Sequence, residues 1–365
     1  MSPFEKLTPG ERRAADGESS AAVAGVTAEV TAIVPARNEE LNIEKCVRAL
    51  AAQPEIEEII VVNDGSSDKT GLILKEMAPR IDRLRVIDIE SLPYGWTGKN
   101  YAISLGASEA TSEWLLFVDA DTELEPWAVE RALGDARRAG AEMVSYSPEQ
   151  ELGTLAERVL VPFVYYRLAR HFSFERVNDP QFADAAANGQ FILIRRSVYE
   201  KSGGHEAVRA KVLEDVALAR LVKAAGYHIF FGPGQGIART RMYRRFGEMW
   251  AGWTKNLYEL IGGTFGAMAL ELVETFPWVE ILLVGIGSAA WGGMRWLLWG
   301  TAAVVLVGRH VAYAAALRRN HVQDSVIQYW LVASVLYGAA LVASWGKRMS
   351  GWVTWKERRY PSGVR

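Results

Sequence analysis

Four aspartates of this chain stand where metal or nucleotide chemistry is expected. Asp64 follows the apolar run Ile-Ile-Val-Val-Asn, and Asp119 and Asp121 close the run Trp-Leu-Leu-Phe-Val. Short apolar runs of this kind indicate buried strands, and the carboxyl ends of parallel strands meet at one edge of a sheet, where ligands bind. Asp215 comes later, at the start of an amphipathic helix. The order predicts an acidic site for a nucleotide and a divalent metal.

Asp119 and Asp121 are separated by a single residue, Ala120. Two carboxylates this close at the mouth of a cleft repel each other unless a cation neutralises them. Mg²⁺ or Mn²⁺ bridging to a diphosphate fits, because such ions take oxygen ligands from one or two carboxylates and from phosphates. A solvated acidic loop is the alternative, since Asp-X-Asp is common by chance.

The ends of the first two predicted strands offer further polar groups. Arg37 and Glu39 follow the first strand and Asp64 the second, so together they could grip the base and ribose of a nucleotide. Ordinary turn and helix-cap chemistry is the alternative for Asp64. Lys99 opens a helix after flexible glycines, where it could meet a phosphate; a surface lysine is the alternative.

Asp215 follows Glu214 in the first turn of its helix. It could act as a general base on an attacking hydroxyl, or it could serve the helix macrodipole. His205 lies upstream in Gly-Gly-His and could line an acceptor site, although a loop histidine is commonly just exposed. Arg241 and Arg244 precede the apolar half and could hold a leaving diphosphate bidentately. Lipid contact is their alternative.

The elements that must position these residues alternate between strands and helices from residue 30 onward. This alternation predicts a doubly wound, mostly parallel α/β sheet covered on both faces. Residues 148 to 188 are less regular and could form a mobile lid or an acceptor-binding wall. The expected strands are Val30 to Val34, Glu58 to Val62, Arg85 to Ile89, Trp114 to Val118, Glu142 to Tyr146, Gln190 to Ile194 and Tyr227 to Phe231.

The 365-residue chain changes composition after about residue 259, where long apolar stretches dominate and predict a membrane region. Three spans are expected, roughly 264 to 290, 296 to 316 and 326 to 345. The first is interrupted by Pro277 and three glutamates, so the count is two to four. The predicted divisions are a disordered segment 1–28, a catalytic domain 29–235, an interfacial basic and aromatic helix 236–258, transmembrane helices 259–346 and a basic tail 347–365.

The net charge of −2, with no basic stripe in the first half, gives no argument for binding nucleic acid. Basic residues instead flank the apolar region on both sides, which favours the cytoplasmic side and anionic lipid head groups. No signal peptide is recognised, so a multi-pass protein of the cell (inner) membrane with a cytoplasmic catalytic domain is expected. The single cysteine, Cys46, excludes an internal disulfide and falls on a helix face that predicts a packed thiol.

Taken in order, several motifs resemble family 2 glycosyltransferases of the GT-A fold, the nucleotide-diphospho-sugar transferase type. They are Val-Pro-Ala-Arg-Asn-Glu-Glu, Val-Asn-Asp-Gly-Ser-Ser-Asp, Gly-Lys-Asn-Tyr-Ala, Asp-Ala-Asp, Asn-Gly-Gln-Phe, Gly-Gly-His and Glu-Asp, between residues 30 and about 258. The resemblance implies transfer from a nucleotide-diphosphate sugar with inversion. It implies donor contacts from Pro35, Arg37, Glu39, Asp64, Lys99 and Asp119, metal contacts from Asp119 and Asp121, Asp215 as base, and acceptor or diphosphate contacts from Asn188, Gly189, His205, Glu214, Arg241 and Arg244.

Gly-Trp-Thr-Gly-Lys, Arg-Met-Tyr, Gly-Trp-Thr-Lys-Asn and Trp-Lys-Glu-Arg-Arg-Tyr resemble more narrowly the membrane-bound enzymes of hopanoid and carotenoid (diaponeurosporenoate-type) glycosylation. Processive synthases carry Gln-X-X-Arg-Trp, which this chain lacks at the comparable stretch, Arg241 to Phe246. The resemblance therefore implies transfer of a single sugar to an isoprenoid-type lipid. The alternatives are a nucleotidyltransferase, a polyprenyl-phosphate or polysaccharide-precursor glycosyltransferase, and a non-catalytic membrane scaffold.

Overall fold

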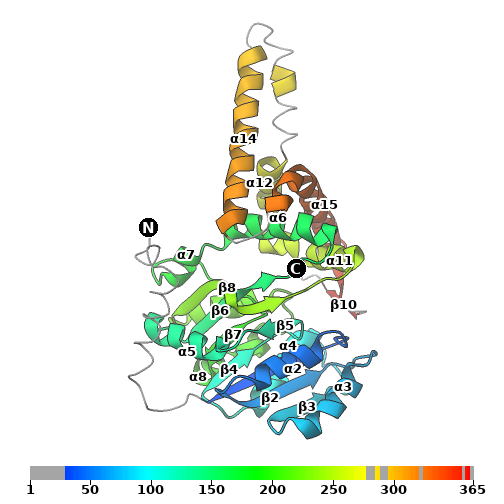
Figure 1. Ribbon diagram of the computed structural model, residues 1–365, viewed down its shortest axis with the longest axis vertical. Helices are drawn as coiled ribbons and strands as arrows, with labels where there is room; N and C mark the ends of the chain where they lie inside the picture. The colour runs from blue at the N-terminus through cyan, green and yellow to red at the C-terminus, as the bar shows by residue number, and fades with distance from the viewer. Residues whose placement is uncertain (1–28, 277–283, 288–294, 320–323, 356–357, 362–365) are drawn as a thin grey trace.

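A computed structural model describes residues 29–276, 284–287, 295–319, 324–355 and 358–361, and an eight-stranded sheet forms its base (Figure 1). The strand order is β3-β2-β1-β4-β7-β6-β8-β5. In chain order the strands are β1 (Val30–Ala36), β2 (Ile56–Asn63), β3 (Leu84–Asp88), β4 (Trp114–Phe117), β5 (Thr122–Leu124), β6 (Met143–Gln150), β7 (Ile192–Arg195) and β8 (Ile229–Thr240).

Parallel pairing joins β1 to β2 and β4, β2 to β3, and β6 to β8. β7 runs antiparallel to both β4 and β6, and β5 runs antiparallel to β8. The mostly parallel sheet expected from the sequence is therefore present, with two reversed strands inserted. β5 was not predicted, because three residues are too few to show a strand period.

Helices cover both faces of the sheet, and alternate residues of β1 show why. Ala32 and Val34 pack into one core with α2, α3 and α5, whereas Ile33 packs into the opposite core with α4 and α10. Successive strand residues point to opposite faces, so a strand buried on both must be apolar throughout. The helices are α2 (Ile43–Ala51), α3 (Thr70–Met77), α4 (Gly98–Glu109), α5 (Ala128–Ala139), α7 (Phe174–Asn178), α8 (Arg196–Lys201), α9 (Gly204–Ala207) and α10 (Glu214–Ala224).

A separate helical cluster lies above the sheet, over β6 and β8, and has an apolar core of its own (Figure 1). Its first helix, α6, starts with a capping box between Thr154 and Glu157 and occupies part of the less regular stretch 148–188, where a Tyr-rich helical segment around Phe163 to Phe174 was expected. The cluster contains α6 (Leu155–His171), α11 (Phe246–Leu260), α12 (Phe265–Thr275), α14 (Arg295–Arg319) and α15 (Trp330–Met349).

A buried ion pair joins α6 to α12 inside this cluster. The guanidinium of Arg167 donates to both carboxylate oxygens of Glu271, at 2.7 and 2.9 Å, and to Glu274 at 2.9 Å. The hydroxyl of Tyr337 on α15 donates to Glu271 at 2.8 Å. Both charged side chains of the pair are only 4% exposed, so each depends on the other for its stability in the apolar core.

Among the described residues, two helices are long and apolar enough to cross a membrane, over Trp296–Arg318 and Ser325–Met349. α14 projects away from the sheet (Figure 1) and exposes large apolar side chains such as Trp296 and Val304, whereas α15 buries one face against α6 and α11. The expected first span is represented by α12, which ends at Thr275, and residues 277–283 and 288–290 of that span lie outside the described residues.

The remaining expected segments differ from the structure in detail. β8 continues to Thr240, so the segment expected as an interfacial helix from 236 begins as a strand, and α11 starts only at Phe246. The described part of the tail contains two short antiparallel strands, β9 (Trp352–Trp355) and β10 (Arg358–Pro361). The segment 1–28 lies outside the described residues. Cys46 is buried in the core, as expected.

Candidate active site

A cavity of about 1610 Å³ lies between the carboxyl edge of the sheet and the helical cluster. We call its two sides the sheet-edge wall, formed by residues 35–42, 64–68, 97–121, 147 and 186–216, and the helical wall, formed by α6, α11, the loop between β8 and α11, and the end of α15. The cavity is larger than a usual small-molecule site, which holds about 300–1,000 Å³. The sequence-predicted residues that line it are Pro35, Arg37, Glu39, Asp64, Lys99, Asp119, Asp121, Asn188, Gly189, Glu214, Asp215, Arg241 and Arg244.

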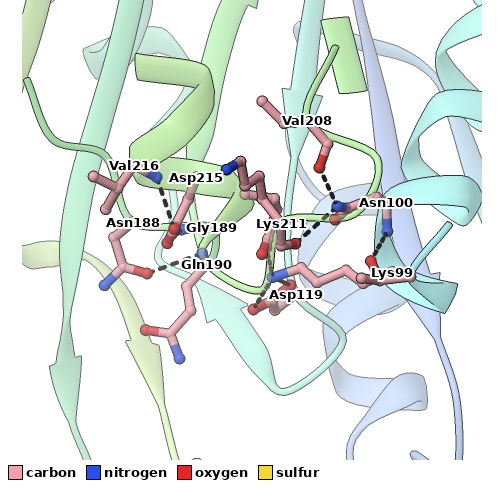
Figure 2. Close-up of polar contacts among 12 residues, drawn as sticks. Lys99, Asn100, Asp119, Asn188, Gly189, Gln190, Val208, Lys211, Asp215 and Val216 are labelled. Carbon is pink, nitrogen blue, oxygen red and sulfur yellow. Dashed lines mark hydrogen bonds and ion pairs between the residues drawn. The ribbon is translucent and has the colours of Figure 1, made fainter. Parts of the chain in front are cut away.

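Lys99 bridges two carboxylates at the centre of the sheet-edge wall (Figure 2). Its Nζ lies 2.8 Å from Oδ1 and 3.0 Å from Oδ2 of Asp119, and 2.7 Å from Oε1 of Glu214. Burial alone would lower the pKa of Lys99, but Asp119, Glu214 and Asp215 raise it well above its usual value. Burial likewise opposes ionisation of Glu214, and Lys99 more than offsets this, so the pKa of Glu214 is lowered.

The amide of Asn100 explains why Lys99 is held in place. Asn100 is fully buried in the first turn of α4, and its Nδ2 donates to the carbonyl oxygens of Val208, Arg209 and Lys211 at 2.9, 3.1 and 3.0 Å. Figure 2 shows these bonds beside Lys99. They tie the start of α4 to the loop that leads into α10, which carries Glu214. The hydrogen bonds of Asn100 therefore hold the backbone segments that carry Lys99 and Glu214 at a fixed distance from each other.

Asp215 is oriented by two backbone amides (Figure 2). Its Oδ2 accepts from the amide of Gly189 at 3.0 Å, and its Oδ1 accepts from the amide of Val216 at 2.8 Å. Burial and the neighbouring Glu214 raise the pKa of Asp215 to about 6, against the opposing charge of Lys99. A fixed carboxylate with a pKa near neutrality meets the requirements of a general base.

The end of β1 braces the loop that follows β2. Arg37 donates through Nη1 to the carbonyl oxygens of Asp64 and Gly65, at 2.5 and 3.1 Å, and the amide of Asp64 donates to Ala36 at 2.8 Å. Glu39 accepts from the side chain of Asn42 at 2.9 Å. These bonds hold Asp64, which is only 4% exposed, at the cavity edge.

Asp119 and Asp121 supply the oxygen donors that a divalent cation would need. Burial raises the pKa of Asp119 against the opposing effect of Lys99, so added positive charge there would stabilise its ionised form. Within the residues that the structure describes, no group of three or more His, Cys, Asp or Glu side chains forms a ready metal site. The two carboxylates fit an ion that takes its remaining ligands from phosphate and water, as Mg²⁺ commonly does.

The helical wall contributes two side chains that the sequence analysis did not select. Tyr165 on α6 contacts the side chain of Asn188, and burial, Asp121 and Asp215 raise the pKa of its hydroxyl. Lys255 on α11 lines the same cavity. Lys255 lies in the Gly-Trp-Thr-Lys-Asn motif that carries the narrower resemblance, but that motif gave it no role at the site. The sequence signal for Tyr165 is a polar group on a helix rich in aromatic residues, a pattern that does not tell which face of the helix meets the cavity.

Three predicted residues have contacts that change their interpretation. Arg241 pairs with Glu157 at 3.2 and 3.3 Å, and Arg244 donates to Asn42 at 2.9 Å, so both brace the cavity wall. His205 is 1% exposed and does not line the cavity, which corrects its assignment to the acceptor site. Its imidazole contacts the Tyr199 hydroxyl at 3.0 Å, and burial lowers its pKa to about 4.

Comparison with known proteins agrees with this geometry. Residues 31–203 match the family described as Glycosyl transferase family 2. The chain is 30% identical over 234 residues to 4,4'-diaponeurosporenoate glycosyltransferase of Staphylococcus haemolyticus, a match that covers 63% of this chain and 61% of the relative. The protein of the same name from Staphylococcus aureus strain MRSA252 is 28% identical over 239 residues, with 64% and 62% covered. The matched part of the chain therefore spans about three fifths of these relatives.

Among solved structures, a mannosyltransferase from Pyrobaculum calidifontis, described in complex with GDP-Man and Mn²⁺, has a TM-score of 0.56 at 18% identity. The likeness covers 88% of this chain and 87% of that one, and it shows a shared fold. The GT-A architecture expected from the sequence is thus confirmed, as is the resemblance that predicted it. Over residues 31–203, this chain is thus similar to glycosyl transferase family 2.

Proposed function

We propose that this chain is an inverting glycosyltransferase that moves a single sugar from a nucleotide-diphosphate sugar to an apolar lipid acceptor. One observation carries the proposal: a single cavity reaches from the acidic strand ends to the helices that pack against the long apolar helices. A polar donor fits the sheet-edge wall, and an apolar acceptor fits the side that contains Leu168, Trp253 and Leu260. The name of the staphylococcal relatives, which refers to a diaponeurosporenoate, supports the isoprenoid character of the acceptor. It does not support the attacking group, because a carboxylate is already ionised, whereas the acceptor proposed here is a hydroxyl.

The proposed roles follow from charge and position. Asp64 binds the nucleotide, and Asp119 and Asp121 hold Mg²⁺ or Mn²⁺. When bound, such an ion supplies Lewis-acid neutralisation of the leaving diphosphate. Asp215 removes the proton from the acceptor hydroxyl, and the two amides that fix its carboxylate keep it aimed while the proton moves. Attack from the face opposite the diphosphate inverts the anomeric carbon.

The proposed location is the cell membrane, with several spans and the catalytic domain in the cytoplasm. Two helices have the length and composition to cross a bilayer. Arg241, Arg244 and Arg245 precede them, and Lys347 and Arg348 lie at the end of the second, which suits the cytoplasmic face of a membrane. A lipid held in the bilayer would then present its polar end at the cavity.

The test is an assay of the full chain in lipid vesicles with nucleotide sugars and Mg²⁺ or Mn²⁺. Release of nucleoside diphosphate that requires a lipid fraction, together with a sugar mass increment on one lipid by mass spectrometry, is expected. Nucleoside triphosphates serve as the control, and release of inorganic diphosphate from them would instead identify a nucleotidyltransferase. Absence of both products with every nucleotide sugar and lipid fraction would contradict the proposal.

A further inference from the structure

A leaving diphosphate needs positive charge from the protein, and the two arginines predicted to supply it are held by other groups. Arg241 pairs with Glu157, which is itself part of the capping box of α6. The guanidinium of Arg241 also fills the space beside Gly153, where an added Cβ would lie 2.0 Å from it. Arg244 donates to Asn42. Arg241 therefore joins two parts of the helical wall, and Arg244 joins the helical wall to the sheet-edge wall.

Lys255 lines the cavity from α11 in the helical wall, across from the acidic cluster of the sheet-edge wall. It is half-buried on α11, and the charges that act on its ammonium group are those of Glu214, Lys99, Asp119 and Asp215. The first three are the members of the bridge described above. Lys255 is thus directed to the sheet-edge wall, where the donor phosphates are expected, although it comes from the helical wall.

The position of α11 is fixed by its packing, so Lys255 is presented from a rigid element. Trp253 and Leu257, on either side of Lys255, are buried in the helical cluster. The amide of Tyr258 donates to the hydroxyl of Ser344 on α15 at 3.0 Å. Preorganised charge of this kind stabilises a developing anion without rearrangement during the reaction.

We propose that Lys255 contacts the diphosphate of the nucleotide sugar and stabilises it as it leaves. This inference rests on the proposed function. In the step, the bond between the acceptor oxygen and the anomeric carbon forms, and the bond from that carbon to the diphosphate oxygen breaks. The electron pair stays on the diphosphate beside Lys255, and the proton passes to Asp215. Burial lowers the pKa of Lys255 to about 8, and an anion at this position favours the charged ammonium.

The test compares nucleoside diphosphates with nucleoside monophosphates, because only the former extend to the proposed contact. Binding of UDP, GDP and dTDP, and of UMP, GMP and dTMP, is measured by calorimetry on the full chain in vesicles, with and without Mg²⁺. Lys255→Met is expected to weaken diphosphate binding about tenfold or more, as for loss of a hydrogen bond to a charged group, and to leave monophosphate binding unchanged. Lys255→Arg is expected to keep most of the affinity.

Lys347→Met is the matched control, because Lys347 also lines the cavity from the helical wall, with its Nζ 2.6 Å from the hydroxyl of Thr254. It is expected to leave both affinities unchanged, and an equal effect there would overturn the assignment to Lys255. Unchanged diphosphate binding in Lys255→Met, or equal loss of both nucleotide classes that Lys255→Arg does not restore, would also overturn it. Failure of the proposed function looks different: the unaltered chain would bind no nucleoside diphosphate.

Discussion

The two walls of the cavity are built on different principles. On the sheet-edge wall, backbone groups fix the reactive side chains or the turns that carry them: two amides hold Asp215, and three carbonyls hold the turn from which Lys99 pairs with Asp119 and Glu214. On the helical wall, side chains are held by other side chains, as in the pairs Arg167–Glu271 and Arg241–Glu157. The difference indicates that the chemistry is fixed by strand ends, while acceptor binding depends on how helices pack.

The largest expected effect is on the rate of sugar transfer, in the variant Asp215→Asn. It tests whether the sheet-edge wall carries the chemistry. The amide keeps the size of the side chain but removes the base, so we expect transfer to fall by about 10²–10⁴-fold. Donor binding should persist, because the change leaves Asp64 and Lys99 in place. Turnover and nucleotide-sugar binding, measured side by side, check this. Loss of binding with retained turnover would remove Asp215 from the proposed role.

Arg167→Met is expected to destabilise the helical wall and to leave the sheet-edge wall unchanged. It removes the guanidinium partner of the buried carboxylate of Glu271 and leaves it with the contacts of His171 and Tyr337, and we expect a loss of about 3–5 kcal/mol in the free energy of unfolding of the helical cluster. The double replacement Arg167→Met with Glu271→Met should recover most of that loss. Denaturant unfolding of the detergent-solubilised chain measures both. If the single and double variants are equally unstable, the pair does not join the helices as described.

The same substitution on each wall gives a matched comparison. In Gly189→Ala, the added Cβ would lie 2.8 Å from Nζ of Lys99, which displaces the bridge. We expect kcat to fall about tenfold or more, with little change in KM for the acceptor. In Gly252→Ala, the Cβ would lie 2.3 Å from the hydroxyl of Tyr243 on the helical wall. There the KM for the acceptor should rise while donor binding is unchanged. If Gly189→Ala and Gly252→Ala changed kcat and the KM for the acceptor in the same way, the assignment of separate roles to the two walls would be contradicted.

The smallest expected effects are in the pH dependence of kcat and of diphosphate affinity. Asp215 must be ionised to accept a proton, and its pKa is raised to about 6, so kcat should be about half-maximal near pH 6 and decline as pH falls further. Glu214→Gln should move this midpoint to lower pH, because the charge of Glu214 is one cause of the raised pKa. On the helical wall the sign is opposite: the pKa of Lys255 is lowered to about 8, so diphosphate affinity should decline above that pH.

The sequence was sufficient to predict the sheet-edge wall because strand ends have a local signature. Asp64, Asp119 and Asp121 each follow an apolar run, and their meeting at one edge follows from parallel pairing alone. The assignment of His205 failed because its burial depends on Tyr199 and Phe117, which pack on it in the folded chain. Periodicity identifies a helix, but it does not tell which neighbouring element the helix will meet.

The helical wall was harder to predict for the same reason. Tyr165 and Lys255 are about ninety residues apart in the chain, and each lies on a helix whose direction is set by contacts with α15. The extension of β8 to Thr240 also lacked a signal, since Gly232, Pro233 and Gly234 interrupt the strand pattern. In the structure these three residues stay in regular register with Tyr146, Ser147 and Pro148, and the register shifts only beyond them, between Pro148 and Glu149.

The ion pair between Arg167 and Glu271 also has a consequence for the order of synthesis. The two residues are 104 positions apart, so at about 5–20 residues per second a ribosome adds Glu271 roughly 5–20 s after Arg167. Until then the guanidinium of Arg167 on α6 lacks its partner Glu271, and the ion pair that joins α6 to α12 in the helical cluster cannot form. The nascent chain therefore completes its sheet-edge wall first, and the cavity is complete only after the later helices have been synthesised.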